Sequence, residues 1–219
     1  MLSYELFIGL RYTRAKRRNH YISFISLISL LGITLGMTAL ITVMSVMNGF
    51  QEEIRTRILG VASHIQISGV NEKLSDWQSV ANEAIKHPQV KSAAPYVSAQ
   101  GMVSFNQVVR GVLVRGVLPS KEENVASFSQ MMVSGKLNNL VPGEFGIVVG
   151  AELAQSLGAS RGDKIVLISP QGQMTPVGIL PRLKQFTITG IFKAGHFEYD
   201  STLALIHMAD AQKLYRMEG

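Results

Sequence analysis

A run of thirty uncharged and mostly apolar residues, from Tyr21 to Phe50, dominates the pattern of this chain. Basic residues precede it at positions 11, 14, 16, 17 and 18. An α-helix rises about 1.5 Å per residue, so roughly 20 residues cross a hydrocarbon core of about 30 Å. Lys and Arg are retained on the cytoplasmic side of a membrane. The pattern therefore predicts a transmembrane helix over residues 21–50, with residues 1–20 in the cytoplasm and the chain after Gly49 outside.

A signal peptide and a buried soluble helix both fit this run less well. A cleaved secretory signal has an apolar region of only about 7–15 residues, whereas this one continues through Val46 and Met47. Most helices of soluble proteins are apolar on one face only, whereas this run is apolar on all faces, so a buried soluble helix is not favoured. Residues 3–12 are expected to form an interfacial helix that enters the span, or an ordinary helix start.

Small residues mark one face of the predicted span. Gly32 and Gly36 are four residues apart, and Ser29 and Ala39 extend the same face. Such faces let helices approach closely in lipid, where association depends on packing and inter-helix hydrogen bonds. We therefore expect a second membrane span to pack there. Apolar positions at helical spacing within residues 51–60 predict that the helix continues outward as a stalk and ends at Gly60.

The pattern after the stalk changes to short strands and helices. Alternation predicts a strand over residues 64–68, a helical pattern covers residues 75–87, and two strands joined at Asn106-Gln107 cover residues 90–117. A β-α-β-β order is typical of a split βαβ layer, which we place at residues 61–119.

A second, mainly β subdomain is predicted over residues 120–207, and residues 208–219 are expected to form a helix that returns toward the first subdomain. Its predicted elements are strands at 147–149, 164–169, 186–191 and 201–206 and a helix at 151–157. The expected fold class is thus α+β, a split βαβ layer plus a mainly β subdomain, on an N-terminal transmembrane helix.

Residues 169–185 contain three prolines and two glycines and show no periodicity, which predicts a loop. Loops above about 12–15 residues in compact domains are usually functional or disordered. Disordered segments are poor in aliphatic residues, and this one has four: Val177, Ile179, Leu180 and Leu183. A proline-stiffened loop loses less entropy when it docks, so we favour a binding element over an inert connection.

Charge and composition exclude several functions. The net charge is +6, but residues 1–20 account for +4 of it, so the remaining 199 residues carry only +2. Attraction of the basic arm to anionic lipid explains that balance, and nucleic acid is not an expected partner. The chain has no cysteine, which excludes disulfides and thiolate chemistry.

Motifs for catalysis are also missing from the sequence. No phosphate-binding loop is present, since Gly158–Lys164 has Asp163 where lysine is required. ATP, if it is used, must be hydrolysed by another subunit. None of the five histidines has a metal-ligand spacing, and the densest cluster, His196, Glu198 and Asp200, is expected to be solvated rather than metal-binding. We predict a non-catalytic subunit with no cofactor and no metal.

Three stretches of the chain resemble a known family. They are FIGLRY at 7–12, GITLGMTALITVMSVMNGF at 32–50 and VVGAELAQSLGASRGDKI at 148–165. In them the chain resembles the membrane subunit of the lipoprotein-releasing (Lol) ABC transporter of Gram-negative inner membranes, within the wider group that includes macrolide exporters and cell-division permeases. Met174–Phe186 is similar to the hook that engages a periplasmic lipoprotein chaperone. We call residues 169–185 the hook segment.

The resemblance implies a function and a set of residues. The subunit would extract lipoproteins from the bacterial inner membrane, with a cytoplasmic ATPase subunit and a second membrane subunit, identical or paralogous, and pass them to the chaperone. The hook would carry over onto Pro176, Val177 and Gly178, with Arg182 and Lys184 as nearby cations. Lipoprotein acyl chains and membrane lipid would contact the outer end of the span at Met44, Met47, Asn48 and Phe50.

Family members differ from this chain in ways that matter for docking. Some have a larger apolar residue at the position of Val177 and a Gln-Arg pair where this chain has Leu183-Lys184. Members also continue through more of the periplasmic domain and three further spans, so we expect this chain to be a portion of the subunit. The alternatives are a mechanotransmission permease of the same architecture, for efflux or cell-wall enzyme control, and a membrane-anchored adhesion or sensor domain.

Overall fold

The computed structural model describes residues 4, 7–9, 11, 20–59, 63, 65–69, 73–175 and 178–217. The chain divides into two compact units, Met1–Ile54 and Arg55–Gly219. Of the helix predicted for residues 3–12, the described positions 4, 7–9 and 11 are helical. The remaining residues of the basic cluster lie outside the described residues.

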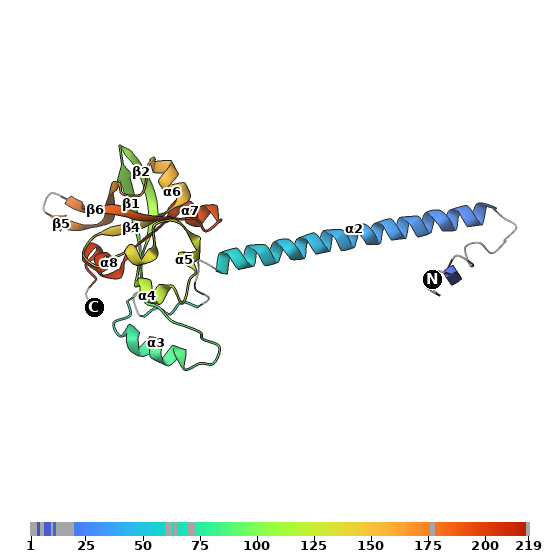
Figure 1. The fold of residues 1–219 in the computed structure, drawn as a ribbon, viewed down its shortest axis with the longest axis horizontal. Helices are drawn as coiled ribbons and strands as arrows, with labels where there is room; N and C mark the ends of the chain where they lie inside the picture. Colours follow the sequence, from blue (N-terminus) through green and yellow to red (C-terminus); the bar gives the residue numbers. More distant parts are fainter. Residues whose placement is uncertain are drawn as a thin grey trace. The chain divides into compact units, whose positions relative to one another are not determined.

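The predicted span is confirmed as part of one continuous helix, α2 (His20–Leu59), which also contains the stalk (Figure 1). Within it, Phe24–Glu52 has a mean hydropathy of 2.2 and none of it is buried, so it is long and apolar enough to cross a membrane. Forty residues correspond to a length of about 60 Å. Gly60, the predicted end, lies outside the described residues.

The second unit contains a seven-stranded mixed sheet with helices around it (Figure 1). The strands are β1 (Tyr96–Phe105), β2 (Val108–Val117), β3 (Met132–Ser134), β4 (Gly146–Gly150), β5 (Lys164–Thr175), β6 (Gly178–Phe192) and β7 (Leu203–His207). The helices are α3 (Trp77–Ile85), α4 (Pro119–Glu122), α5 (Phe128–Met131), η2 (Leu137–Asn139), α6 (Ala151–Leu157), α7 (Phe197–Thr202) and α8 (Met208–Tyr215). The mixed α and β composition confirms the predicted fold class.

Strand pairing closes the sheet on itself. The order is β3-β6-β4-β7-β2-β1-β5, and β5 pairs again with β6, so all strands except β3 form a closed barrel. The β2–β7 and β4–β6 pairs are parallel and the others antiparallel. Closure satisfies backbone groups that an open sheet would leave at its edges.

The two subdomains predicted on either side of residue 120 do not exist as separate sheets. Strand β2 from the first pairs with β7 from the second, and β1 pairs with β5. The strand expected at 64–68 is also wrong for the described residues 65–68, which have no regular structure. Ile65 and Ile67 alternate as a strand requires, but strand formation needs a neighbour for its backbone hydrogen bonds, and the described chain supplies none there.

Local patterns predicted several elements correctly. The helix expected at 75–87 is α3, which begins where the Asp76 side chain accepts a hydrogen bond from Ser79 N–H at 3.2 Å. The turn between β1 and β2 falls at Asn106 and Gln107, both with positive φ, which suits the twist of a hairpin. The short elements α3, β4 and α6 needed no distant contact to be recognised.

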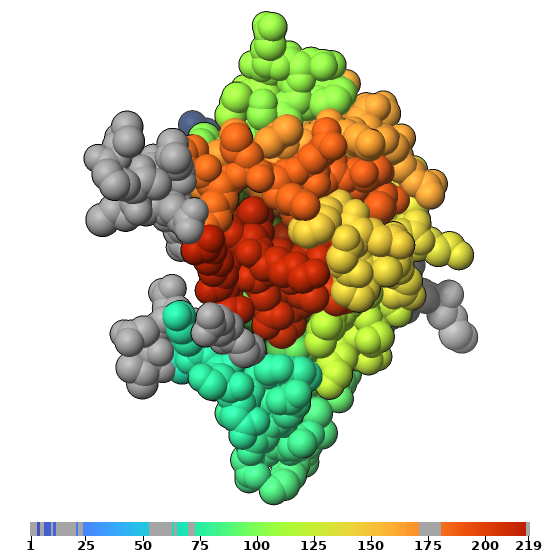
Figure 2. Space-filling model, turned by 90° about the vertical axis from the view of Figure 1, so that its left-hand side faces the viewer, coloured from blue at the N-terminus to red at the C-terminus, as the bar shows by residue number. Residues whose placement is uncertain are grey.

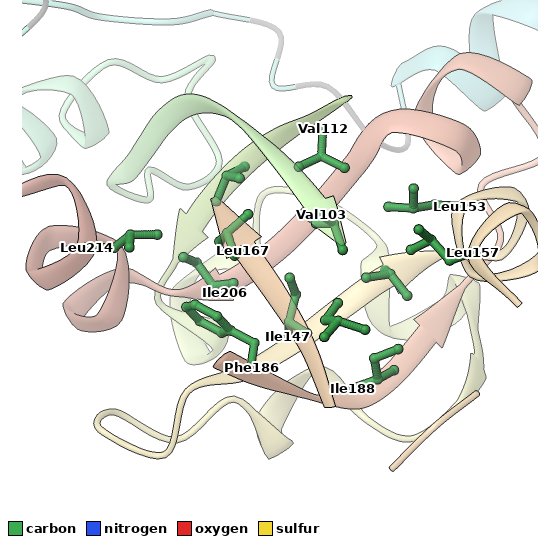
Figure 3. Packing of buried hydrophobic residues seen from close by; sticks show 14 of the residues in the cluster. Val103, Val112, Ile147, Leu153, Leu157, Leu167, Phe186, Ile188, Ile206 and Leu214 are labelled. Carbon is green, nitrogen blue, oxygen red and sulfur yellow. The ribbon is translucent and has the colours of Figure 1, made fainter. Parts of the chain in front are cut away.

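The barrel interior is the main hydrophobic core (Figure 3). Alternate residues of each strand point inward, as the period of a strand requires. Inward-facing examples are Val103, Val112, Ile147, Leu167, Phe186, Ile188 and Ile206. Leu153 and Leu157 of α6 and Leu214 of α8 enter from opposite sides of this interior in Figure 3. The two helices therefore close the core on two sides.

A second core covers part of the barrel's outer surface. Val148 and Leu205 point away from the interior and pack under the segment that contains α5 and η2. The rings of Phe128 and Phe192 meet edge to face there, with centroids 5.6 Å apart. This segment, residues 119–140, had no predicted structure because its helices are each a single turn.

Helix α8 lies close to the barrel because glycines face it. A Cβ on Gly116 of β2 would be 2.5 Å from the Cβ of Ala211, and one on Gly101 would be 3.3 Å from the Tyr215 hydroxyl oxygen. The Tyr215 hydroxyl donates to the carbonyl oxygen of Gln100 at 3.4 Å. Within the segment 208–219, which was predicted to return toward the first subdomain as a helix, α8 packs against β1 and β2.

Truncation of an interior side chain should destabilise the barrel strongly. Phe186 is 1% exposed, so Phe186→Ala should lower the free energy of unfolding by about 3–5 kcal/mol. Val133→Ala is the control, because Val133 is 66% exposed and should change stability by at most about 0.5 kcal/mol. Urea unfolding of the chain in detergent, followed by near-ultraviolet circular dichroism, measures both. Equal effects would contradict the core assignment.

A buried ion pair predicts a pH-dependent effect. Arg115 Nη2 lies 3.1 Å from Glu122 Oε1, and the Glu122 side chain is fully buried. Burial raises the pKa of Glu122 and the nearby Arg115 lowers it. Arg115→Met removes the positive partner of this pair, so it should cost about 3–5 kcal/mol at neutral pH.

The cost of Arg115→Met should shrink as the pH falls. A carboxyl with a raised folded pKa binds its proton more tightly in the folded state, so its destabilising charge is removed below that pKa. Unfolding free energies measured from pH 8 to pH 4 for the wild type, Arg115→Met and the double variant Arg115→Met/Glu122→Leu test this. A cost that does not change with pH would refute the role of the Glu122 charge.

Candidate functional site

The residues predicted to contact lipid lie in the C-terminal half of α2. At about 100° per residue, Met44, Met47 and Asn48 fall within roughly 100° of the helix circumference, and Phe50 lies about 60° beyond Met47. Met44, Met47 and Phe50 are 63%, 54% and 61% exposed. This face, which we call the methionine face, combines unbranched apolar side chains with one amide, and unbranched thioethers adapt to chains of varied shape.

The small-residue face of α2 is also open in the unit Met1–Ile54. A Cβ placed on Gly32 or Gly36 would meet no atom within 4 Å. Across the helix, Thr34, Thr38 and Thr42 form a ladder in which each hydroxyl donates to the carbonyl oxygen four residues earlier, at 2.7–2.8 Å. These hydroxyls have their hydrogen bonds within the helix, so the threonine face can lie against lipid without an unsatisfied donor.

The hook segment is a β-hairpin, and its prediction as a loop without regular structure was wrong. Strands β5 and β6 continue past the barrel, with Gln173 opposite Leu180 and Thr175 opposite Gly178 (Figure 1). Prolines at 170, 176 and 181 interrupt the alternation by which a strand is recognised. Pairing across the hairpin, which a single-strand pattern does not reveal, extends both strands.

The tip and the two cations of the hook segment occupy different places. Pro176 and Val177 lie outside the described residues, and Gly178 begins β6 beside the tip. Arg182 and Lys184 pair with Ser169 and Leu167 at the barrel end of the hairpin. The structure therefore separates the predicted cations from the predicted tip by several residues of strand.

Both cations at the base of the hairpin make contacts within the chain. Arg182 Nη1 donates to the carbonyl oxygen of Leu214, at the end of α8, at 3.1 Å. Lys184 Nζ lies 3.8 Å from the centroid of the Phe145 ring, which itself packs edge to face on Phe186. Sequence patterns missed both partners, because a backbone carbonyl and a lone aromatic residue carry no motif.

Of the cluster His196, Glu198 and Asp200, the aspartate has a structural role. Asp200, 2% exposed, accepts hydrogen bonds from Ala194 N–H at 2.6 Å and Gly195 N–H at 3.0 Å. Its predicted neighbours, His196 and Glu198, stand at the start of α7 and not on a strand, so the three do not share a strand face. Among the described residues no group of three or more His, Cys, Asp or Glu side chains could hold a metal ion.

Burial also shifts the pKa of two groups at the ends of α8, His207 and Tyr215. Burial lowers the pKa of His207, and the nearby Asp210 acts in the opposite direction. His207 Nδ1 accepts from Ala209 N–H at 3.2 Å and so begins the helix. Burial raises the pKa of Tyr215 to about 12. The hydrogen bond from Tyr215 to Gln100 anchors the end of α8 to the barrel.

Comparison with known proteins decides the family. The model of the MacB-like periplasmic core domain matches residues 26–218. The chain belongs to the family of MacB-like periplasmic core domains. The match includes most of α2 and the whole barrel, and it agrees with the resemblance found in the sequence.

Curated relatives extend this likeness over nearly the whole chain. The lipoprotein-releasing system transmembrane protein LolC of Neisseria meningitidis is 47% identical over 218 residues, which is 100% of this chain and 52% of that protein. LolC of Xylella fastidiosa strain 9a5c is 44% identical, over 97% of this chain and 51% of that protein. LolE of Haemophilus influenzae is 31% identical, over 94% and 50%. The chain spans about half the length of the relatives it matches.

Proposed function

We propose that this chain forms part of the membrane subunit of an ABC transporter that extracts lipoproteins from the bacterial inner membrane and transfers them to a periplasmic chaperone. The observation that carries the proposal is the likeness to lipoprotein-releasing transmembrane proteins over all of the chain, hook segment included. Permeases for efflux or cell-wall control share the architecture, but they have no use for a projecting hairpin that ends in aliphatic residues.

The span supplies the anchor and the lipid contact in this proposal. The basic cluster before Tyr21 holds residues 1–20 in the cytoplasm, so the barrel lies in the periplasm. The methionine face is at the outer end of the span, where acyl chains leaving the outer leaflet would first meet protein. Close packing at Gly32 and Gly36 provides the contact with a second membrane subunit, because helices in lipid associate through small residues.

The hook segment supplies the chaperone contact. Strand pairing between Gln173 and Leu180 orders the hairpin before any partner binds, so little conformational entropy is lost on docking. Pro176, Val177 and Gly178 form the tip that enters the chaperone, and the cation of Lys184 at the base contacts its surface. The aliphatic tip suits a partner whose own ligand is a lipid chain.

ATP hydrolysis belongs to a separate cytoplasmic subunit, because the sequence has no phosphate-binding loop. Helix α2 runs without a break from His20 to Leu59, so it can transmit a movement at its cytoplasmic end to the stalk. The chain's own part is positioning: it presents lipid-contacting and chaperone-contacting surfaces, and it performs no chemistry.

Replacement of the hook tip should abolish capture of the chaperone. Pro176–Gly178 replaced by Gly-Ser-Gly keeps the loop length and removes the apolar contact. Pull-down of the periplasmic lipoprotein chaperone by the purified membrane complex should fall to background. The matched control replaces the turn Asn106-Gln107 with Asn-Gly at the other hairpin and should leave capture unchanged. Retained capture after the tip replacement would refute the role of the hook segment.

A photo-crosslinking residue at Met47 should recover acylated protein. The control position is Ser45, which lies at nearly the same depth but about 160° away around the helix. Crosslinking in membranes that contain the assembled transporter, followed by detection of acylated products, should give adducts at position 47 and not at position 45. Equal yields at the two positions would mean that the methionine face has no special access to lipoprotein.

A further inference from the structure

The hairpin that carries the hook is joined to the barrel through a break in strand pairing. Regular pairing ends at Ser169 opposite Arg182 and resumes at Gln173 opposite Leu180. Residues 170–172 on β5 therefore stand opposite the single residue Pro181 on β6. Extra residues in one strand disrupt the ladder and bend it.

Two prolines weaken the strand pairing at this break further. Residues 170 and 181 are both proline, and proline has no N–H to donate to a ladder. A two-stranded ribbon is marginal in isolation, so beyond the break its direction is poorly fixed by strand pairing. Some other contact must determine where the hook tip points.

Arg182 provides that contact at the last regular pair before the break. Its Nη1 donates to the carbonyl oxygen of Leu214 at 3.1 Å, and its Nε is buried. Figure 2 shows the red surface of the C-terminal segment, which includes α8, beside the orange surface of the barrel end of the hairpin strands. Arg182 thus ties the base of the hairpin to a helix rather than to its own sheet.

The acceptor is well suited to a cation. The last carbonyls of an α-helix have no partner within the helix, and the helix dipole makes this end favourable for positive charge. The αL residue Arg216 ends α8, and Met217 N–H donates to Gln212 O, so the described cap leaves Leu214 O to Arg182.

Helix α8 is itself held firmly in place. Ala211 and Leu214 are 0% and 6% exposed within the main core, and Tyr215 donates to Gln100 of β1. A series of contacts therefore sets the hook direction: the barrel core holds α8, α8 binds Arg182, and Arg182 holds the hairpin. Leu183, the next residue, is 62% exposed on the opposite side of the strand.

We infer that Arg182 is a positioning residue, which fixes the direction of the hook by binding the C-terminal end of α8 and does not itself contact the chaperone. The inference rests on the proposed function for its effect on chaperone capture. It revises the role implied by resemblance, in which Arg182 was one of two cations at the docking surface. Lys184, which is exposed, keeps that role.

Spin labels can measure the hook direction directly. The chain has no cysteine, so Gln173→Cys on the hairpin and Gln155→Cys on α6 would be the only two labelling sites. In the full chain in detergent, the distance distribution between the labels should be narrow with Arg182 present. Arg182→Met keeps an unbranched apolar side chain but removes the guanidinium donors, so it should broaden the distance distribution. Arg182→Lys should restore most of the narrow distribution, because the lysine Nζ can donate to the same carbonyl.

Chaperone capture by the complex should follow the label distances. Arg182→Met should weaken capture about tenfold, the change expected when one charge-assisted hydrogen bond is lost, while Arg182→Lys stays within about twofold of the wild type. Lys213→Met is the matched control, because it removes an exposed charge from α8 and should change neither the distances nor capture.

The outcomes separate this inference from the proposed function. A distance distribution that stays narrow in Arg182→Met overturns the positioning role, whatever happens to capture. Equal loss of capture in Arg182→Met and Lys213→Met, with unchanged distances, would assign Arg182 a general electrostatic effect and also overturn it. A wild-type complex that captures no chaperone would refute the proposed function, while the label distances would still decide the role of Arg182.

Discussion

The pairing of β5 with β6 is the constraint on which the second unit depends. These two strands close the barrel, since without their contact the sheet would have open edges at both. The same strands continue outward as the hook segment. Because one hairpin performs both tasks, the projecting part is continuous with the pair of strands that closes the barrel, and the contact of Arg182 with α8 fixes its direction beyond the break at residues 170–172.

Three buried carboxylates among the described residues bind other parts of the chain. Asp200 collects two backbone N–H groups before α7, and Asp210 accepts from Gly143 N–H at 2.8 Å. Glu122 and Arg115 join α4 to β2. Asp200 and Asp210 accept hydrogen bonds from backbone N–H groups in irregular connections, which would otherwise lack a partner.

Apolar side chains are buried in the barrel and exposed on α2. In the barrel they are enclosed, and Val103, Ile147 and Leu205 are fully buried. In α2 every described side chain from Phe24 to Phe50 is exposed, including Leu35 at 76%. Such a helix is stable only in an apolar solvent, because lipid replaces the core that the helix lacks. The contrast agrees with a helix that is long and apolar enough to cross a membrane.

Elements with a local sequence signal could be predicted from the sequence, whereas features that depend on pairing between distant strands could not. The span, α3, α6 and the β1–β2 hairpin were predictable, because their signals lie in hydrophobic periodicity and turn residues within a few positions of one another. The Gly32–Gly36 face followed from helical spacing, whereas the residues of the methionine face came from the family resemblance, and the contacts expected at both faces stay predictions. Four features could not be predicted from the sequence: the closed barrel, the extension of β5 and β6, the lack of regular structure at residues 65–68, and the hydrogen bond from Arg182 to Leu214. Each depends on backbone groups that meet across long stretches of chain, and backbone hydrogen-bonding groups are the same in every residue except proline, so no side-chain pattern records which of them will pair.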